Sequence, residues 1–153
     1  MSVTSPAGFR ASGVTAGSKA SGKPDVALAI NDGPRDVAVG VFTSNRFKAA
    51  PVLWSQQVLA DRTARAVFIN SGGANACTGP EGFADTHHTA EKVAEVLTAT
   101  GFEAGAGDVV VCSTGLIGER LPMDRIFAGV ELSVAQLSDA GGADNWIDRK
   151  SVV

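Results

Sequence analysis

Tyrosine is absent from this chain of 153 residues, and cysteine occurs only twice, as Cys77 and Cys112. Two distant cysteines exclude a disulfide scaffold and a zinc knuckle, because both need several cysteines at short, regular spacings. An unpaired cysteine usually packs as a small hydrophobic residue. We therefore expect both thiols to be free and buried.

Long apolar runs and basic runs are missing as well. No window approaches the roughly 20 apolar residues of a membrane-spanning helix, and residues 1–6 show no cationic stretch leading into an apolar one. We therefore expect no membrane association and a cytoplasmic protein. The 13 basic residues are scattered among 16 acidic ones, for a net charge of -3, so no nucleic-acid partner is expected.

Several common site motifs are also absent. The sequence has no Gly-x-Ser-x-Gly elbow, phosphate loop or dinucleotide fingerprint, so no nucleotide cofactor is indicated. His87 and His88 are adjacent, and adjacent helical positions point about 100° apart. The two histidines therefore cannot share a metal ion as histidines four residues apart do. We expect His87 in the core and His88 at its rim.

The residues that are present predict one globular domain or a large piece of one, since 44% are hydrophobic and 19% are charged. Apolar alternation predicts strands over 9–17, 25–31 and 36–43, and the turn residues 32–35 predict a hairpin between the last two. Short apolar runs predict buried strands over 66–70 and 108–112, the second broken by Ser113, Thr114 and Gly115.

Helical spacing appears in three further segments. A helix is predicted over 51–60, where Pro51 suits a first position, and another begins at Pro122 and ends before Gly141. Between them, Thr78 and Glu81 have the spacing of a capping box at the start of a helix that ends near Gly101. The order of elements predicts a layered α/β fold, and a doubly wound sheet remains open from the pattern alone.

Two loops at strand ends carry candidate chemistry. In the 70–79 loop, small residues and two glycines precede a helix, an arrangement that can turn backbone N–H groups toward an anion. Without other information, a tight connection whose small residues only permit close packing is the preferred explanation of this loop. In the 112–118 loop, the Thr114 hydroxyl and the Gly115 amide could form an oxyanion hole. A turn or a helix cap is the alternative for these residues.

Six sequence blocks, in this order, resemble blocks of the ornithine acetyltransferase family. They are 8–11 (GFRA), 40–46 (GVFTSNR), 49–52 (AAPV), 70–79 (NSGGANACTG), 85–87 (DTH), and 112–118 (CSTGLIG) with 121–123 (LPM). Each block is short, but together they cover the chain up to about Gly142, and the ordered set is highly specific.

The resemblance implies transfer of an acetyl group from N-acetylornithine to glutamate. Acetyl-CoA is a further donor in some members, and no other cofactor is implied. The implied nucleophile is a threonine freed by autocatalytic cleavage, whose own amino group can act as the base. The family's paired oxyanion stabilisers match Thr114 and Gly115. The implied fold is a layered αββα sandwich resembling that of N-terminal nucleophile hydrolases, whose alpha and beta chains assemble into a heterotetramer.

The blocks that carry the family's nucleophile and substrate-binding lysine do not occur in this sequence. We expect residues 1–142 to be the N-terminal part of the alpha chain and residues 143–153 to be a non-family tail created by truncation; a separately encoded short chain is the alternative. The chain alone is then expected to be inactive and to expose apolar surface at 37–41 and 109–111. Two other functions stay open: a related self-cleaving aminopeptidase, and a non-catalytic anion-binding module that uses the 70–79 loop.

Overall fold

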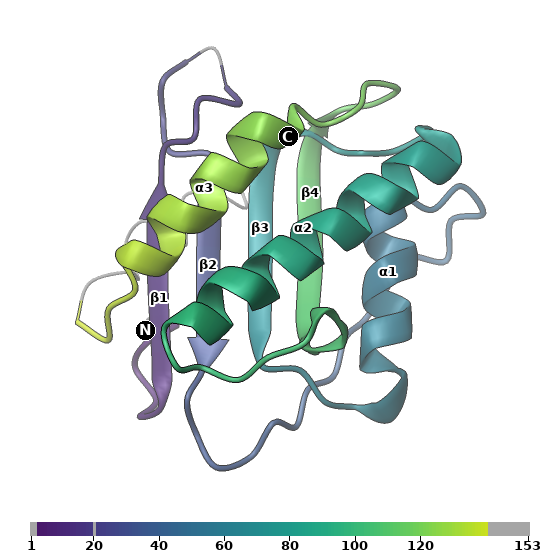
Figure 1. Cartoon of the computed structure of the whole chain (residues 1–153). Coiled ribbons are helices and arrows are strands. Elements are labelled where there is room, and N and C mark those ends of the chain that lie inside the picture. Colours follow the sequence, from purple (N-terminus) through teal and green to yellow (C-terminus); the bar gives the residue numbers. More distant parts are fainter. Residues whose placement is uncertain (1–2, 20, 141–153) are drawn as a thin grey trace.

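The computed structural model describes residues 3–19 and 21–140, which form one mixed sheet with helices packed against it (Figure 1). The strands β1 (Phe9–Val14), β2 (Val26–Asn31), β3 (Ala66–Gly73) and β4 (Val109–Leu116) are neighbours in chain order. The first three are antiparallel, whereas β4 runs parallel to β3. The carboxyl ends of β3 and β4 therefore lie at the same end of the sheet.

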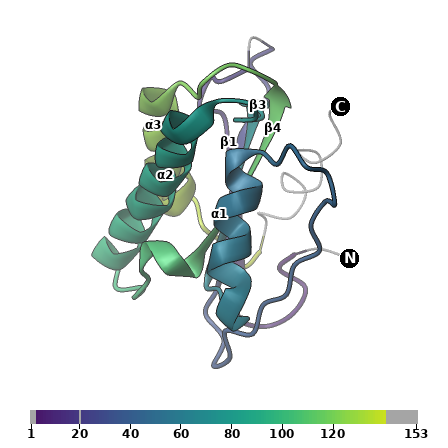
Figure 2. The same cartoon turned by 90° about the vertical axis from the view of Figure 1, so that its right-hand side faces the viewer.

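Two helices cover one face of this sheet. Helix α2 (Gly79–Ala99) connects β3 to β4, as a parallel pair requires a long crossover, and α3 (Met123–Ala135) lies beside it (Figure 2). The core between the helices and the sheet includes Leu28, Phe68 and Val93, each with an exposed fraction of 0%. Burial of these apolar side chains is the main favourable contribution to the stability of the fold.

Helix α1 (Ala50–Val58), followed by the short 3-10 helix η1 (Leu59–Asp61), covers part of the free edge of β4. Trp54 Nε1 donates a hydrogen bond to the Val109 carbonyl oxygen at 2.9 Å. Ser55 Oγ donates to the Val111 carbonyl oxygen at 2.8 Å and accepts from the Val111 N–H at 3.2 Å. Side chains of α1 thus satisfy backbone groups that an edge strand would otherwise leave unpaired.

The α/β class and most predicted elements are confirmed, but the hairpin between 25–31 and 36–43 is wrong. Within residues 36–43 the only pairing is an isolated bridge between Val37 and Thr63. The reason is that both hydrogen-bonding edges of β2 are occupied, one by β1 and the other by β3. A strand at 36–43 has no free edge of β2 to join.

Two further expectations about strands need correction. Strand β4 does not break at residues 113–115 but continues to Leu116, because β3 also extends through Gly73 and pairs with it. The exposed apolar surface expected at 37–41 is confirmed, since Val37 and Val39 have exposed fractions of 76% and 84%. At 109–111 the expectation is wrong for Val109 and Val111, which are buried beneath the helices, whereas Val110 is partly exposed on the opposite face of the sheet. The predicted tail over 143–153 lies outside the described residues.

An ion pair at the start of β1 predicts a pH-dependent stability. Arg10 binds both carboxylate oxygens of Asp32, one through Nη2 at 3.0 Å and the other through Nε. The hydrogen bond from Arg10 holds the pKa of Asp32 below its ordinary value of 3.8. Because the folded-state pKa is the lower one, the pair stabilises the fold above about pH 4 and loses this contribution as the pH falls through the lowered pKa.

We therefore expect Arg10→Gln to lower the urea midpoint of unfolding near neutral pH, and the difference from wild type to shrink steadily below about pH 4. Denaturation followed by circular dichroism at a series of pH values measures this difference. A difference that stays constant into the acid range would show that the charge on Asp32 does not contribute.

Candidate functional site

The site is built where β3 and β4 end side by side. Ser71 pairs with Thr114 and Gly72 pairs with Gly115. The two backbones approach so closely that a Cβ on Gly115 would lie 2.4 Å from the Gly72 carbonyl carbon. Gly115 also has a φ of 134°, which side-chain-bearing residues rarely adopt. Glycine is therefore required at position 115 on two separate grounds.

Thr114 lies on the face of the sheet opposite to α2 and α3. Side chains alternate between faces along a strand, and Val109 and Val111 occupy the helix-covered face. Thr114 consequently shares the open face with Val110 and Cys112. Its side chain is partly buried, and no side-chain hydrogen bond among the described residues involves its hydroxyl. The Thr114 hydroxyl is thus available to a ligand.

The Gly115 amide points away from β3, toward the outer edge of the sheet. Backbone groups alternate in direction along a strand in the same way as side chains do, and those of Val111 face α1. Gly115 lies four positions after Val111, so its backbone groups point to the same side of the strand as those of Val111. The backbone groups of the neighbouring Leu116 point to the other side, toward β3. Its carbonyl oxygen accepts a hydrogen bond from the Ala74 N–H at 2.8 Å. The hydrogen bonds from α1 reach Val109 and Val111, and Gly115 lies farther along the strand.

Strand parity therefore places both groups at the corner where the open face joins the free edge of β4, the Thr114 side chain on the face and the Gly115 N–H at the edge. Adjacent donors of this kind can stabilise the negative oxygen that develops during acyl transfer. The role of the two residues as such donors remains a prediction of the sequence analysis.

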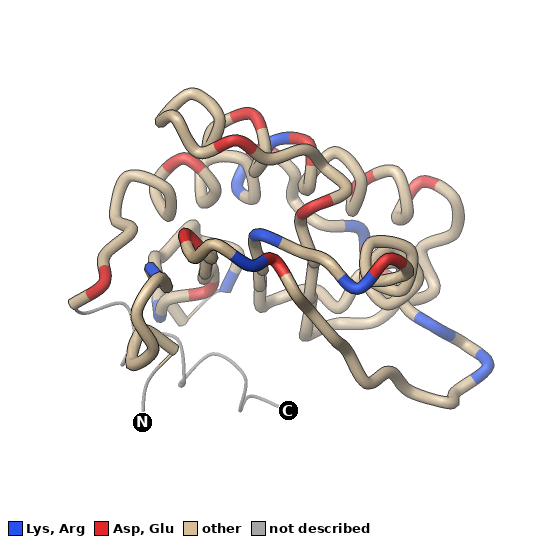
Figure 3. The backbone as a smooth tube through the Cα atoms, turned by 90° about the horizontal axis from the view of Figure 1, so that it is seen from below, with Lys and Arg blue, Asp and Glu red and all other residues tan. Residues whose placement is uncertain are grey.

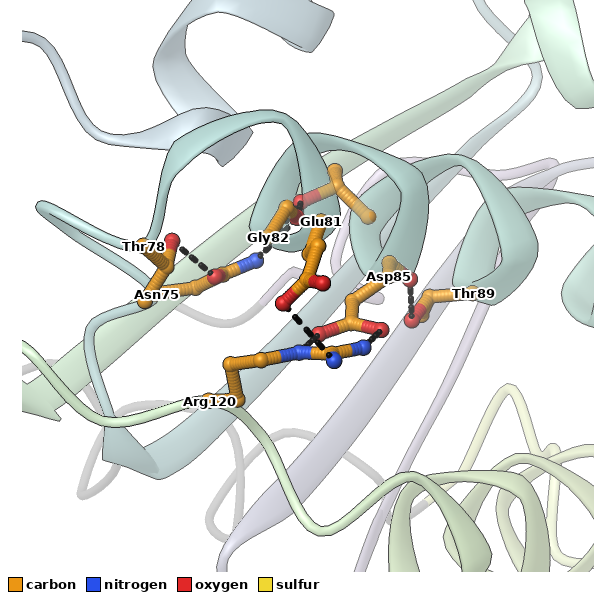
Figure 4. A network of polar contacts seen from close by, with 8 residues as sticks. Asn75, Thr78, Glu81, Gly82, Asp85, Thr89 and Arg120 are labelled. Carbon is orange, nitrogen blue, oxygen red and sulfur yellow. Dashed lines mark hydrogen bonds and ion pairs between the residues drawn. The ribbon is translucent and has the colours of Figure 1, made fainter.

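The 70–79 loop uses its polar side chains for internal packing (Figure 4). Asn75 is completely buried; its Nδ2 donates to the Gly82 carbonyl oxygen at 2.7 Å and to Thr86 Oγ1 at 2.9 Å. Thr78 Oγ1 donates to Asn75 Oδ1 at 2.7 Å. The predicted capping box is wrong, because Thr78 is engaged with Asn75 and caps no helix N–H. These contacts favour the packing explanation of the loop.

The expectation that both cysteines are buried is wrong, although neither forms a disulfide, as expected. Cys112 is exposed because it lies on the open face of β4, and Cys77 because it lies on the loop before α2 with a φ of 58°. His87 is also not a core residue. It lies at the border of the buried helical stripe, where its ring packs on Trp54 with the centroids 4.9 Å apart, and its side chain is 44% exposed.

Three charged residues near the site were missed by the sequence analysis. Asp25 is buried, and its carboxylate accepts hydrogen bonds from the backbone N–H groups of Ala16 at 2.6 Å, Lys19 at 3.0 Å, and Ser18. Arg120 Nε and Nη2 donate to the two carboxylate oxygens of Asp85 at 2.9 and 2.6 Å. The Asp85–Arg120 contact spans 35 positions, so no local pattern marks it, whereas the Asp25 carboxylate binds amides six to nine positions earlier in the chain without a recognisable motif.

The open face of the sheet forms an apolar groove of about 510 Å³. Its lining comes from strand residues such as Ala29, Val67 and Val110 and from the exposed segment that includes Val39 and Phe42. The groove extends to Cys112, two positions before Thr114 on the same face. A mainly apolar surface thus extends to within two positions of Thr114 along β4.

Charge is not concentrated on one side of the molecule. Figure 3 shows acidic and basic residues interspersed along the backbone in the view from below. Among the described residues, no group of three or more histidine, cysteine, aspartate or glutamate side chains could hold a metal ion. Within the same residues, no helix has the length and apolar character needed to cross a membrane.

Comparison with known sequences supports the resemblance. The model of the ArgJ family matches residues 10–148. The arginine biosynthesis bifunctional protein ArgJ of Streptomyces coelicolor is 63% identical over 142 residues, which cover 93% of this chain and 36% of the relative. The corresponding protein of Mycobacterium tuberculosis is 67% identical over 128 residues, covering 84% of this chain and 32% of the relative. The chain thus spans about a third of the length of these curated relatives.

Solved structures agree with this result. The crystal structure of the ornithine acetyltransferase of Mycobacterium tuberculosis, complexed with ornithine, superposes with a TM-score of 0.93 at 61% identity, covering 94% of this chain and 75% of that chain. ArgJ of Bacillus halodurans superposes with a TM-score of 0.84 at 31% identity, covering 97% and 74% respectively. The expected fold is thereby confirmed for this part of the sandwich. The family model, the sequence identities and the shared structure together show that the chain belongs to the ArgJ family.

Proposed function

We propose that this chain is the N-terminal part of an acetyltransferase that transfers the acetyl group of N-acetylornithine to glutamate, and that Thr114 and Gly115 form its oxyanion hole. The observation that carries the proposal is the adjacent placement of the Thr114 hydroxyl and the Gly115 N–H at the end of β4. The relatives are an arginine biosynthesis bifunctional protein and an ornithine acetyltransferase, which supports this choice of acyl chemistry.

The two donors act at the step in which a nucleophile attacks the acetyl carbonyl. The carbonyl oxygen then gains negative charge, and the Thr114 hydroxyl and Gly115 amide donate hydrogen bonds to it. Both donors are already fixed by the β3–β4 pairing, so little reorganisation is needed when the charge develops. Collapse of the tetrahedral intermediate breaks the amide C–N bond, releases ornithine and leaves the acetyl group as an ester on the nucleophile. The amino group of glutamate then attacks this ester at the same position, which releases N-acetylglutamate and regenerates the free nucleophile.

The other parts of the machinery belong to this proposal as well. The nucleophilic threonine, the substrate-binding lysine and a beta chain that completes a heterotetramer would come from the part of the family protein that this chain does not span. Acetyl-CoA would act as a further acetyl donor, and the cytoplasm would be the compartment. Residues 1–142 would then belong to the alpha chain of this acetyltransferase, and the match to the family model extends to residue 148.

A chimera tests the proposal. Residues 10–140 replace the matching segment of the Streptomyces coelicolor relative, and the purified protein is assayed with N-acetylornithine and glutamate. We expect N-acetylglutamate to form with the chimera and not with the isolated chain. Turnover by the isolated chain would show that the nucleophile lies within it, and a folded chimera without turnover would contradict the proposed function.

The chimera and the isolated chain also test the two alternative functions, an aminopeptidase and an anion-binding module. An aminopeptidase would release amine from an aminoacyl p-nitroanilide, a reaction that we expect neither protein to catalyse. An anion-binding module would respond to phosphate in a calorimetric titration of the isolated chain. The closed side-chain network around Asn75 favours no response.

A further inference from the structure

The connection that leaves the site after Gly115 is exposed, yet it is fastened at three points. Residues 115–120 are all exposed. The first point is the hydrogen bond from the Ala74 N–H to the Leu116 carbonyl oxygen at 2.8 Å, and the second is that from the Gly118 N–H to the Ala76 carbonyl oxygen at 2.9 Å. The third is the only one made by charged side chains, and it joins Arg120 to helix α2.

Arg120 and Asp85 form a two-pronged ion pair. Asp85 is 3% exposed, and its two carboxylate oxygens accept from Arg120 Nε at 2.9 Å and Nη2 at 2.6 Å. Arg120 Nη1 also donates to Glu81 Oε2 at 3.2 Å. Such planar, doubly hydrogen-bonded pairs fix geometry better than single contacts. A buried carboxylate without a cation is unfavourable, so Asp85 holds Arg120 and the segment that carries it in place.

The helix that supplies Asp85 is itself fixed to the 70–79 loop. Asn75 Nδ2 donates to the Gly82 carbonyl oxygen and to Thr86 Oγ1, at the first turns of α2 (Figure 4). The packing there is close, since a Cβ on Gly82 would lie 1.9 Å from Thr78 Oγ1. The start of α2 thus forms one rigid base that holds both the loop after β3 and the loop after β4.

We propose that the Asp85–Arg120 ion pair positions the oxyanion donors by fixing the segment that follows Gly115. Asp85 and Arg120 are positioning residues in this proposal, since neither lies at the corner where the donors meet. The pair also gives a role to the 85–87 block, which the proposed function leaves unexplained. The inference rests on the proposed function for its kinetic consequence, but its structural consequence can be measured without activity.

Hydrogen exchange of the isolated chain measures the structural consequence. We expect Arg120→Gln and Asp85→Asn to raise the exchange rate of the hydrogen-bonded amides in 112–120, such as that of Gly118, at least tenfold, with little change for amides in β1 and β2. The matched control is Arg10→Gln, which breaks another two-pronged pair, Arg10–Asp32, at the opposite end of the sheet. Unchanged exchange in 112–120 in both folded Arg120 and Asp85 variants would overturn the proposal, whatever the activity of the enzyme.

Kinetics of the chimera measure the functional consequence. We expect Arg120→Gln to lower kcat about tenfold with KM nearly unchanged, because misplaced donors weaken binding of the transition state more than binding of the substrate. Arg120→Lys should restore part of the loss. In a Thr114→Ala background the further loss should be much smaller, because the effect acts through the same donors.

A merely structural role predicts something else. In that case Arg120→Gln would lower the amount of folded protein by the same factor in the wild-type and in the Thr114→Ala background. Equal losses of kcat per folded enzyme in the two backgrounds would overturn the kinetic part of the proposal. If the wild-type chimera shows no turnover, the proposed function fails, and the exchange measurement alone decides whether the pair fixes residues 112–120.

Discussion

Replacing Gly115 with alanine is expected to lower the free energy of unfolding by about 4 kcal/mol, a sum of backbone strain and overpacking. The strain arises because φ is 134°, and the overpacking because the new Cβ would lie 2.4 Å from the Gly72 carbonyl carbon. Both obstacles are backbone, so no side-chain rearrangement can relieve them. The urea midpoint of the chain measures the loss, with an unchanged slope confirming that stability alone has changed.

Two other glycines provide matched controls for this prediction. Gly118 has a φ of 86° but no atom within 4 Å of an added Cβ, so Gly118→Ala reports the backbone strain alone, about 1 kcal/mol. Gly107 has neither obstacle, and Gly107→Ala should change the stability by less than about 0.5 kcal/mol. If Gly115→Ala unfolds at the same urea concentration as Gly118→Ala, the close approach of β3 and β4 is not a constraint on the fold.

Thr114→Ala is expected to lower kcat of the chimera with the Streptomyces coelicolor relative about a hundredfold, the typical cost of one oxyanion-hole donor. KM for N-acetylornithine should change little, because the donor acts on charge that develops after the substrate has bound. The stability should also stay close to wild type, since the hydroxyl makes no hydrogen bond among the described residues. Initial rates over a range of substrate concentrations separate the two kinetic constants.

The hydroxyl can be tested separately from the size of the side chain. Thr114→Ser keeps the donor and should retain most of the activity, whereas Thr114→Val keeps the shape and should lose as much as Thr114→Ala. Equal activity of the valine variant and wild type would contradict a role for the hydroxyl. The Gly115 amide would then be the remaining donor of the proposed pair.

Local patterns in the sequence predicted the elements whose signals are local. The run at 66–70, the stripe of α2 and the helix after Pro122 need only their own residues to be recognised. The hairpin at 36–43 failed because the partner of β2 is decided by competition among strands. Apolar residues do alternate along 36–43, but both edges of β2 are occupied by other strands, β1 and β3.

The candidate site was predicted only in part, because some of its contacts are local in the sequence and others are not. Thr114 and Gly115 could be identified because they are neighbours in the sequence, and the resemblance of the chain to the family implied their role. The contacts around them could not be found in this way, because Gly72 approaches Gly115 from β3 and Asp85 binds Arg120 from α2. The Cys112 thiol was predicted wrongly because its burial depends on which face of β4 is covered, and the sequence of the strand alone does not determine this.

The hydrogen bond from Ser113 Oγ to Asn70 Oδ1, at 2.6 Å, joins residues that are 43 positions apart. It belongs to the parallel pairing of β3 and β4, which cannot form until the whole of α2 has crossed between them. Contacts at such separations carry a large loop-closure entropy and form slowly compared with local ones. The paired strand ends are therefore a late product of folding, and a growing chain acquires its pair of donors only after the crossover has closed.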